Sequence, residues 1–233
     1  LHIICCKGLV LVIALDPPFG PSGEYTVYDI VEETCEVAYG YKIGLPLVLE
    51  QGLKVVSEIK STCKGRVIVD FKLADIGDIL VSVAEKISRY RADAVIAHGF
   101  IGLRDSIDKL VEAASRYRLD VILVASMSHR GSEEFIDKHF EELVNLSLDL
   151  GVHGVVVPAN KPGLIRRARQ IAGSSLRIYS PGIGVQGAEV GSALCAGADY
   201  EIIGRYITRS PKPGEKAREV FEKHVESVRK CQS

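Results

Sequence analysis

The feature that most constrains the fold of this chain is an alternation, repeated eight times, of short apolar runs and longer amphipathic stretches. The apolar runs are rich in Val, Ile and Leu, which is the composition of parallel strands that are buried on both faces. We expect strands at residues 9–15, 41–43, 66–70, 93–97, 120–125, 154–157, 176–179 and 200–203.

The stretches between these runs have helical composition and polar outer faces. We expect helices at residues 24–39, 46–60, 79–91, 103–118, 133–150, 161–172, 189–196 and 214–230. Eight strand–helix units in 233 residues favour a closed parallel barrel over an open doubly wound sheet. No linker or low-complexity segment divides the chain. The sequence therefore predicts an α/β protein whose residues 1–233 form a single (β/α)8 TIM-barrel catalytic domain.

Composition excludes several classes of protein. A net charge of −1 offers no global electrostatic basis for binding nucleic acid or a membrane surface. No apolar run reaches the roughly 18 residues of a membrane span. The apolar stretch at 1–15 has no basic leading region and no cleavage site, so we interpret it as leading into the first strand. Six scattered cysteines without a CxxC pair indicate reduced thiols in a cytoplasmic protein and no zinc site.

The stretch RVIVDFKLADIGD at residues 66–78 combines a buried strand with four charged residues. Because side chains alternate along a strand, Asp70 and Lys72 are expected on the same side of it. Asp75 is expected in the following loop or in the first turn of the next helix, close to Asp78. A lysine between carboxylates stays charged. This pattern fits either a catalytic array or a solvated ion-pair network at a strand end.

Further polar residues fall where the expected strands end, and in a barrel these ends form the rim on which active sites are built. They are Asp16, Lys42, Asp70, Lys72, His98, Ser128, the loop 181–187 and Arg205. Charges at the opposite rim are interpreted as ordinary strand-start residues, and they are Lys7, Arg66, Asp93 and Asp120. We interpret His98 as a hydrogen-bonded structural histidine, and Cys5-Cys6 as buried residues that fill space in a strand. The polar loop 126–133 suits a closing lid, and its His129 is interpreted as a surface residue.

The loops after the seventh and eighth expected strands have the composition of a phosphate site. Gly182, Gly184 and Gly187 allow the backbone to approach a ligand closely, and Gly204 precedes Arg205 in the next loop. Glycine-rich loops after strands seven and eight form the phosphate site of many such barrels. The guanidinium of Arg205 is planar and permanently charged, which suits phosphate oxygens. The two loops together predict phosphate binding.

Taken together, these motifs resemble the orotidine 5′-phosphate decarboxylase family over nearly the whole chain. The matching motifs are Ala-Leu-Asp ending at Asp16, Tyr-Lys-Ile-Gly around Lys42, DFKLADIGD at 70–78, Met-Ser-His at 127–129, PGIGVQG at 181–187 and Gly204-Arg205. The resemblance implies a carboxy-lyase that converts orotidine 5′-monophosphate to UMP in de novo pyrimidine biosynthesis. It also implies that the reaction needs no metal, flavin or other cofactor.

The resemblance also implies roles for individual residues. Lys72 donates a proton to C6 of the pyrimidine as carbon dioxide leaves, and Asp70 lies beside the substrate carboxylate. Lys42 and the partner subunit's Asp75 complete an array of alternating charges, so the protein is expected to be a homodimer with shared active sites. The implied substrate-binding residues are Asp16, Ile76, Ser128, Pro181, Gly182, Gly184, Gln186, Gly187, Gly204 and Arg205.

Among these, Asp16 and Lys42 match residues that contact the ribose hydroxyls. Ser128 matches a contact to the pyrimidine ring, and Gln186 matches part of the phosphate site together with Gly204 and Arg205. One position departs from the family pattern. Many members carry a threonine that contacts the ribose where this chain has Ile79, so this contact is expected to be absent or replaced.

Two alternatives remain open at this point. Magnesium-dependent keto-gulonate phosphate decarboxylases and hexulose phosphate synthases of the same superfamily also use an Asp-x-Lys-x-x-Asp strand. They typically have an acidic residue where this chain has Lys42, and they lack the context of Ser128 and Gln186. A catalytically inactive barrel that only binds a nucleotide or phosphate is the other alternative, and it would be expected to have lost Lys72 or an aspartate.

Overall fold

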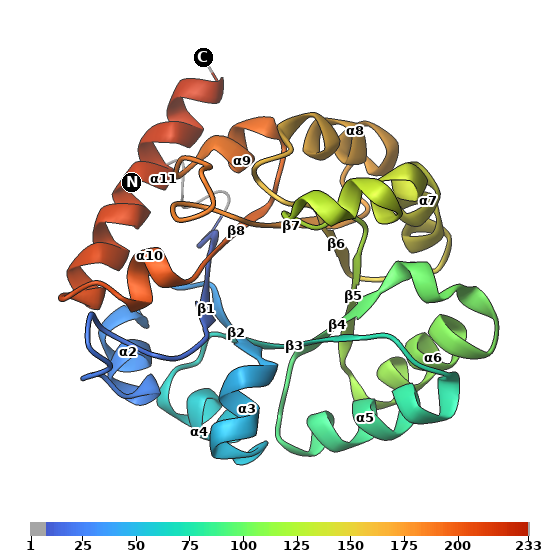
Figure 1. Ribbon diagram of the computed structural model, residues 1–233, viewed down its shortest axis with the longest axis horizontal. Coiled ribbons are helices and arrows are strands. Elements are labelled where there is room, and N and C mark those ends of the chain that lie inside the picture. The colour runs from blue at the N-terminus through green and yellow to red at the C-terminus, as the bar shows by residue number, and fades with distance from the viewer. Residues whose placement is uncertain (1–7, 233) are drawn as a thin grey trace.

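The computed structural model describes residues 8–232 as a closed barrel of eight parallel strands with helices around it (Figure 1). The strands follow one another around the barrel in chain order, and β8 pairs with β1 to close it. Their bounds are β1 Leu11–Leu15, β2 Gly40–Gly44, β3 Arg66–Leu73, β4 Ala94–His98, β5 Asp120–Val124, β6 Gly154–Val156, β7 Arg177–Pro181 and β8 Tyr200–Ile203. The predicted TIM barrel is confirmed.

The helices cover the outside of the barrel (Figure 1). Their bounds are α2 Val27–Thr34, α3 Leu45–Gln51, α4 Lys54–Thr62, α5 Gly77–Arg89, α6 Asp108–Tyr117, α7 Phe140–Asp149, α8 Pro162–Ala172, α9 Ser192–Ala196, α10 Arg205–Thr208 and α11 Pro213–Gln232. Short turns of other helical types are η1 Gly99–Ile101, η2 Leu103–Ile107, η3 Arg130–Glu134 and η4 Ile136–His139. Between residues 8 and 232, no helix has the length and apolar character needed to cross a membrane.

Several helix boundaries differ from the sequence-based expectation. The helix expected at 46–60 is two helices, because Gly52 adopts a left-handed backbone with φ of 75° that ends α3. The segment 133–150 begins with two short 3-10 turns, and the α-helix starts only at Phe140. At the start of α2, the hydroxyl of Thr26 accepts a hydrogen bond from the backbone N–H of Asp29, which fixes the first turn.

The barrel interior is filled with side chains, so it is a core and not a pore. The buried inward-facing residues are Val12, Ala14, Ile68, Ala94, Ile96, Ile122, Val124, Val156, Tyr179 and Ile202. Near the amino ends of the strands the ring of Tyr200 stacks on those of Tyr39 and Tyr179, at centroid distances of 4.2 and 4.7 Å.

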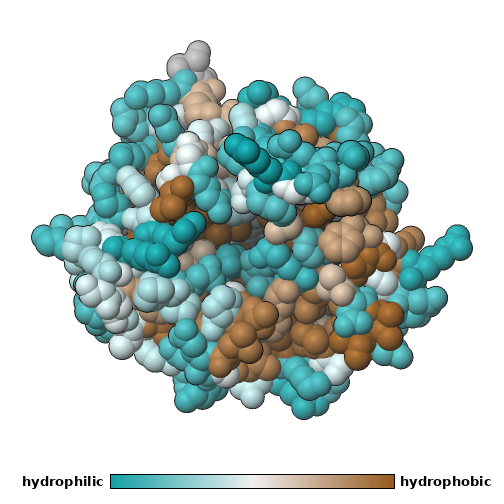
Figure 2. Space-filling view, in the orientation of Figure 1, coloured by the Kyte–Doolittle hydropathy of each residue, from teal (hydrophilic) through white to brown (hydrophobic). Residues whose placement is uncertain are grey.

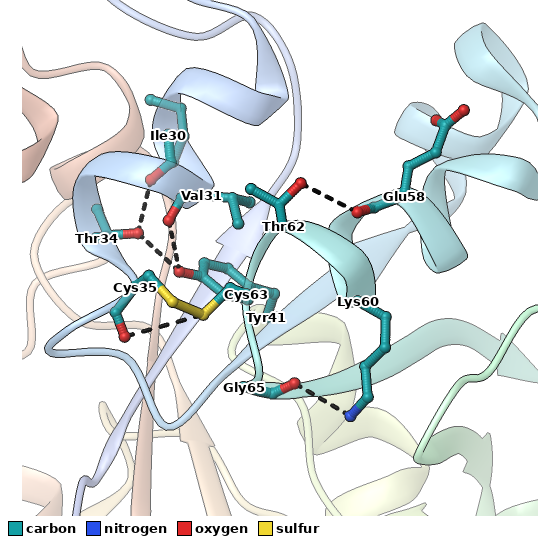
Figure 3. Close-up of a disulfide and its surroundings, with 10 residues drawn as sticks. All are labelled: Ile30, Val31, Thr34, Cys35, Tyr41, Glu58, Lys60, Thr62, Cys63 and Gly65. Carbon is teal, nitrogen blue, oxygen red and sulfur yellow. Dashed lines mark hydrogen bonds between the residues drawn. A yellow bond between two sulfur atoms is a disulfide. The ribbon is translucent and has the colours of Figure 1, made fainter.

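The expectation that all cysteines are reduced thiols is wrong for four of the six. Cys35 at the end of α2 bonds to Cys63 after α4, with 5.8 Å between their Cα atoms (Figure 3). Cys195 in α9 bonds to Cys231 in α11, with a Cα–Cα distance of 5.5 Å. Each pair is distant in sequence, and only the packing of the helices brings the sulfurs within bonding reach. Cys5 and Cys6 lie outside the described residues.

Charges at the amino-end rim form ion pairs with one another, as expected of strand-start residues. The ammonium of Lys60 contacts Asp93 at 2.6 Å, and the guanidinium of Arg66 pairs with Asp120. The carboxylate of Asp93 also accepts the backbone N–H of Val67 at 2.7 Å. The charges of Arg66, Asp93 and Asp120 are therefore each paired with an opposite charge at this rim. Lys7 lies outside the described residues.

Candidate active site

A cavity of about 360 Å³ opens at the carboxyl ends of the strands. Predicted site residues on its wall are Asp16, Lys42, Asp70, Lys72, Ser128, Pro181, Gly182, Gln186, Gly204 and Arg205. Its floor is apolar and is formed by Ala14, Ile96, Val124, Val156 and Ile202 from inside the barrel. The volume suits a small-molecule ligand, and charged and polar groups surround an apolar floor.

The central charge cluster is built by an irregularity in β3. The pairing of β3 with β4 shifts between Asp70 and Leu73, and Lys72 has a positive φ of 46°. The regular alternation of side chains along β3 therefore ends after Asp70, although the sequence analysis placed Lys72 on the same side as Asp70 by continuing that alternation. Even so, the Nζ of Lys72 contacts the Oδ2 of Asp70 at 2.9 Å. A left-handed lysine is an unusual backbone state, and such strained positions are enriched at functional sites.

Lys42, the central residue of β2, approaches the same carboxylate from the neighbouring strand. Its Nζ lies 3.1 Å from the Oδ2 of Asp70 and 3.6 Å from the Oδ2 of Asp16. The absence of a side chain at Gly44 is required here, because a Cβ at that position would collide with the Oδ1 of Asp16. The Oδ1 of Asp70 is buried and makes no hydrogen bond to any described residue. One oxygen of Asp70 thus holds two ammonium groups while the other is unpartnered.

Burial and charge act in opposite directions on the ionisation of this cluster. Lys42 is 9% exposed and Asp70 is 6% exposed. Burial alone would lower the pKa of Lys42, but the carboxylates of Asp70 and Asp16 outweigh it and raise that pKa above its ordinary value. Burial alone would raise the pKa of Asp70, but Lys42 and Lys72 outweigh it and lower that pKa. Both groups are therefore charged at neutral pH.

His98 lies at the end of β4 and is also buried at 9% exposed. Its ring packs against Phe100 with 4.6 Å between centroids. Burial, assisted by the nearby charge of Lys72, lowers the pKa of His98, so the imidazole is neutral at physiological pH. His98 does not line the cavity. Its buried Nδ1 makes no hydrogen bond to any described residue, so the structure does not bear out the hydrogen bond that was expected of it.

Four predicted site residues do not line the cavity in the described chain. Asp75 and Ile76 lie in the loop between β3 and α5, and both are exposed. Asp75 turns its Oδ1 to the backbone N–H of Ile76 at 2.8 Å. Gly184 and Gly187 have positive φ values of 76° and 96° in the loop after β7, where they shape the turn.

The opposite end of the cavity is formed by the loops after β7 and β8. Gly182, with φ of 104°, and Gln186 lie on one side, and Arg205 at the start of α10 lies on the other. Arg209 also lines the cavity and was missed by the sequence analysis. The available signal was its spacing of four residues from Arg205, since residues i and i+4 of a helical turn share a face. The backbone N–H of Arg209 donates to the carbonyl of Arg205 at 3.1 Å, which confirms that turn.

Comparison with protein-family models gives a match to the orotidine 5′-phosphate decarboxylase / HUMPS family over residues 10–220. The chain belongs to this family. Within residues 8–232, no group of three or more His, Cys, Asp or Glu side chains is placed to hold a metal ion.

Relatives within the family cover most of this chain. An orotidine 5′-phosphate decarboxylase of Methanosarcina acetivorans is 40% identical over 216 residues, spanning 93% of this chain and 95% of its own length. One from Aeropyrum pernix is 38% identical, over 91% of this chain and 87% of its own.

Solved structures of the family agree with the fold. The decarboxylase of Sulfolobus solfataricus superimposes with a TM-score of 0.84 at 35% identity, and the match covers 94% of this chain and 99% of that one. The decarboxylase of Methanocaldococcus jannaschii in complex with the inhibitor BMP gives 0.83 at 33% identity, over 92% and 97% of the two chains.

Proposed function

We propose that the charge cluster of this site decarboxylates orotidine 5′-monophosphate to UMP, the reaction of the carboxy-lyases in this family. The single observation that supports this assignment best is the row of charges formed by Lys42, Asp70 and Lys72, in which Lys42 and Asp70 are buried. Its two ammonium–carboxylate distances are 3.1 and 2.9 Å. The presence of Lys42, where the magnesium-dependent branch typically has an acid, favours the decarboxylase over that branch.

The proposed chemistry follows from what the reaction requires. Breaking the bond from C6 to the carboxylate releases carbon dioxide and leaves an electron pair on C6, with no adjacent electron sink in the ring. A fixed cation near C6 lowers the barrier because it interacts more strongly with this carbanion than with the starting carboxylate. Lys72 supplies that cation and then transfers a proton from its Nζ to C6, which completes the exchange of carbon dioxide for hydrogen.

Asp70 has two parts in this mechanism. Its Oδ2 holds the ammonium of Lys72 in place at 2.9 Å. Its negative charge lies next to the place where the substrate carboxylate binds, which favours loss of that carboxylate. We assign the ribose hydroxyls to Asp16 and Lys42, and the pyrimidine ring to Ser128.

We assign the 5′-phosphate to the loops after β7 and β8. The positions are Pro181, Gly182, Gly184, Gln186, Gly187, Gly204 and Arg205. The phosphate is remote from C6, but the free energy of binding it can hold the loops closed around the base. Arg209 on the same wall adds a second guanidinium to this end of the cavity.

We also propose that the protein is a homodimer in which the partner subunit's Asp75 and the partner subunit's Ile76 complete the site. In the single chain the residues Asp75 and Ile76 of this loop are exposed and do not line the cavity. Exposed apolar side chains occur in α3, in and just after this loop, and in the turns after β4, and they are Leu45, Leu49, Ile76, Ile79, Phe100 and Leu103. Figure 2 shows apolar groups gathered over α3, the end of β3 and the loops after β4. A contiguous apolar surface of this kind is typical of a subunit interface.

The remaining assignments concern the whole chain. We propose that residues 1–233 act as one catalytic domain in the cytoplasm. Disulfides are rare in most cytoplasmic proteins, but intracellular proteins of hyperthermophilic archaea are an exception. Several similar decarboxylases come from archaea, including Thermococcus kodakarensis and Pyrococcus abyssi.

The function is tested by following the absorbance of orotidine 5′-monophosphate after adding purified protein in buffer with EDTA. We expect rapid loss of substrate with the wild type and none with Lys72→Ala, because the variant lacks both the cation and the proton donor. A folded wild type without turnover would contradict the proposal, and sugar phosphates with magnesium would then be the next substrates.

The shared site is tested by mixing two inactive variants, Lys72→Ala and Asp75→Ala. If the partner subunit's Asp75 completes each site, mixed dimers contain one site with both residues intact, and activity returns on mixing. No recovery in mixtures shown to exchange subunits would contradict the shared site without affecting the assignment of Lys72.

A further inference from the structure

A buried polar network lies behind the loop that carries Ser128, and no step of the proposed mechanism uses it. Its centre is Asp137 in η4, whose side chain is 14% exposed. The Oδ1 of Asp137 accepts hydrogen bonds from the hydroxyls of Ser126 and Ser132, both at 2.6 Å. Its Oδ2 pairs with the ammonium of Lys161 at 2.5 Å. Ser126 and Ser132 are fully buried.

The direction of these hydrogen bonds follows from the charge of Asp137. Burial would raise the pKa of Asp137, but Lys161 and the two serine hydroxyls outweigh it and lower that pKa. An ionised carboxylate can only accept, so both hydroxyls must donate to it. The oxygen of Ser132 then has its lone pairs free, and it accepts the backbone N–H of Met127 at 3.1 Å. The charge of Asp137 thus orients Ser132, and Ser132 fixes the backbone at Met127.

A second arm of the network reaches the same loop from the amino end of α8. The side-chain amide of Asn160 donates to the carbonyl of Ser128 at 3.0 Å, and Lys161 follows it directly in the chain. The backbone of Met127 and Ser128 is therefore held from two sides. Ser126, Met127 and Ser128 all line the active-site cavity.

We propose that Asp137 is a positioning residue for the nucleotide base, acting through Ser132 on the loop of Met127 and Ser128. This inference rests on the proposed function, in which Ser128 contacts the pyrimidine ring. It predicts that damage to the network affects ligands that carry a base and spares ligands that carry only ribose and phosphate. The phosphate end of the cavity is built from other loops, after β7 and β8.

The experiment compares UMP with ribose 5-phosphate, which lacks the base, as ligands in calorimetric titrations of the full chain. The main variant is Ser132→Ala, because it removes the link to Met127 and leaves the Asp137–Lys161 ion pair intact. Loss of one hydrogen-bond acceptor for a buried N–H is expected to weaken UMP binding about tenfold. Ribose 5-phosphate binding should change by less than about twofold. Asp137→Asn should likewise weaken the binding of UMP much more than the binding of ribose 5-phosphate.

Two matched controls separate positioning from general damage. Ser147→Ala removes an equally buried hydroxyl that bonds the carbonyl of Leu143 within α7. Asp93→Asn breaks the partly buried ion pair with Lys60 at the opposite rim. Both controls should leave the ratio of UMP to ribose 5-phosphate affinity unchanged.

The possible outcomes are distinct. The positioning role would be overturned if the wild type turns over substrate normally and Ser132→Ala either weakens the binding of both ligands equally or leaves the affinity for UMP unchanged. A wild type that neither decarboxylates orotidine 5′-monophosphate nor binds UMP would overturn the proposed function, and the role of Asp137 with it. A base-specific loss of affinity, matched by a fall in kcat/KM, would support the proposal.

Discussion

Replacing Asp70 by Asn should destabilise the folded protein as well as abolish its chemistry. The carboxylate of Asp70 is the common partner of two ammonium groups, at 3.1 Å from Lys42 and 2.9 Å from Lys72. An amide of the same shape carries no charge. The variant therefore leaves the buried ammonium of Lys42 with only the more distant carboxylate of Asp16, at 3.6 Å.

The size of the effect follows from the burial of each partner. Removing one member of a buried ion pair typically costs about 3–5 kcal/mol in the free energy of unfolding. The side chain of Lys42 is 11% exposed, so this contact counts nearly in full. The side chain of Lys72 is 41% exposed, so solvent screens its contact and it adds at most about 1 kcal/mol. Because Asp16 still compensates Lys42 in part, we expect a loss of about 3 kcal/mol.

The pH dependence gives a second signature with a definite sign. Lys42 and Lys72 lower the pKa of Asp70 in the folded state. A carboxyl whose folded pKa is depressed stabilises the protein above its unfolded pKa of about 4, and this contribution is lost as the pH falls through the folded pKa. The stability difference between wild type and Asp70→Asn should therefore be full at neutral pH and shrink below about pH 4.

The assay is urea unfolding at fixed protein concentration, since dimerisation would make stability depend on concentration. Asp78→Asn in the same motif is the control, because Asp78 is exposed in the first turn of α5. Its replacement should cost less than about 1 kcal/mol. The reasoning is refuted if Asp70→Asn unfolds at pH 7 within about 1 kcal/mol of the wild type, or if the difference does not change in acid.

Two further predictions concern other parts of the molecule. Cys63→Ser should lower the free energy of unfolding by about 3–4 kcal/mol, because the lost bridge to Cys35 closes a long loop in the unfolded chain. Thermal unfolding of the wild type and the variant, with and without a reductant, checks this. A variant with the same Tm as the wild type in both conditions would contradict the disulfide. Arg209→Gln should weaken UMP binding about tenfold if its guanidinium contacts the phosphate. Arg218 is an exposed arginine on α11, and Arg218→Gln should leave UMP binding unchanged. If the two substitutions weaken binding equally, Arg209 acts only through the net charge of the protein.

Much of the barrel could be read from the order of its elements. All eight expected strands are present, and the range 200–203 expected for the last strand is the range of β8. Buried parallel strands can be recognised in a sequence because both of their faces are apolar. Amphipathic helices between such strands are compatible with few folds other than a parallel α/β sheet or barrel. Helix ends were less predictable, since Gly52 breaks one expected helix for a local backbone reason.

The residue types of the site could also be predicted from the sequence, because Asp16, Lys42, Asp70 and Arg205 lie in or just after the carboxyl-terminal halves of expected strands. Their contacts could not. The bulge in β3 and the left-handed backbone of Lys72 decide how that lysine meets Asp70, and strand alternation does not describe them. Arg209 lacked a motif of its own, although its helical spacing from Arg205 was visible.

By itself, the sequence determined the class of fold, the rim on which the chemistry lies and the family to which the chain belongs. These properties depend on local patterns that repeat along the chain. Tertiary structure alone decided which cysteines pair, which carboxylate oxygen holds two lysines and how Asp137 reaches the loop of Ser128. Those contacts join residues that are distant in sequence, and they depend on how helices and loops pack around the finished barrel.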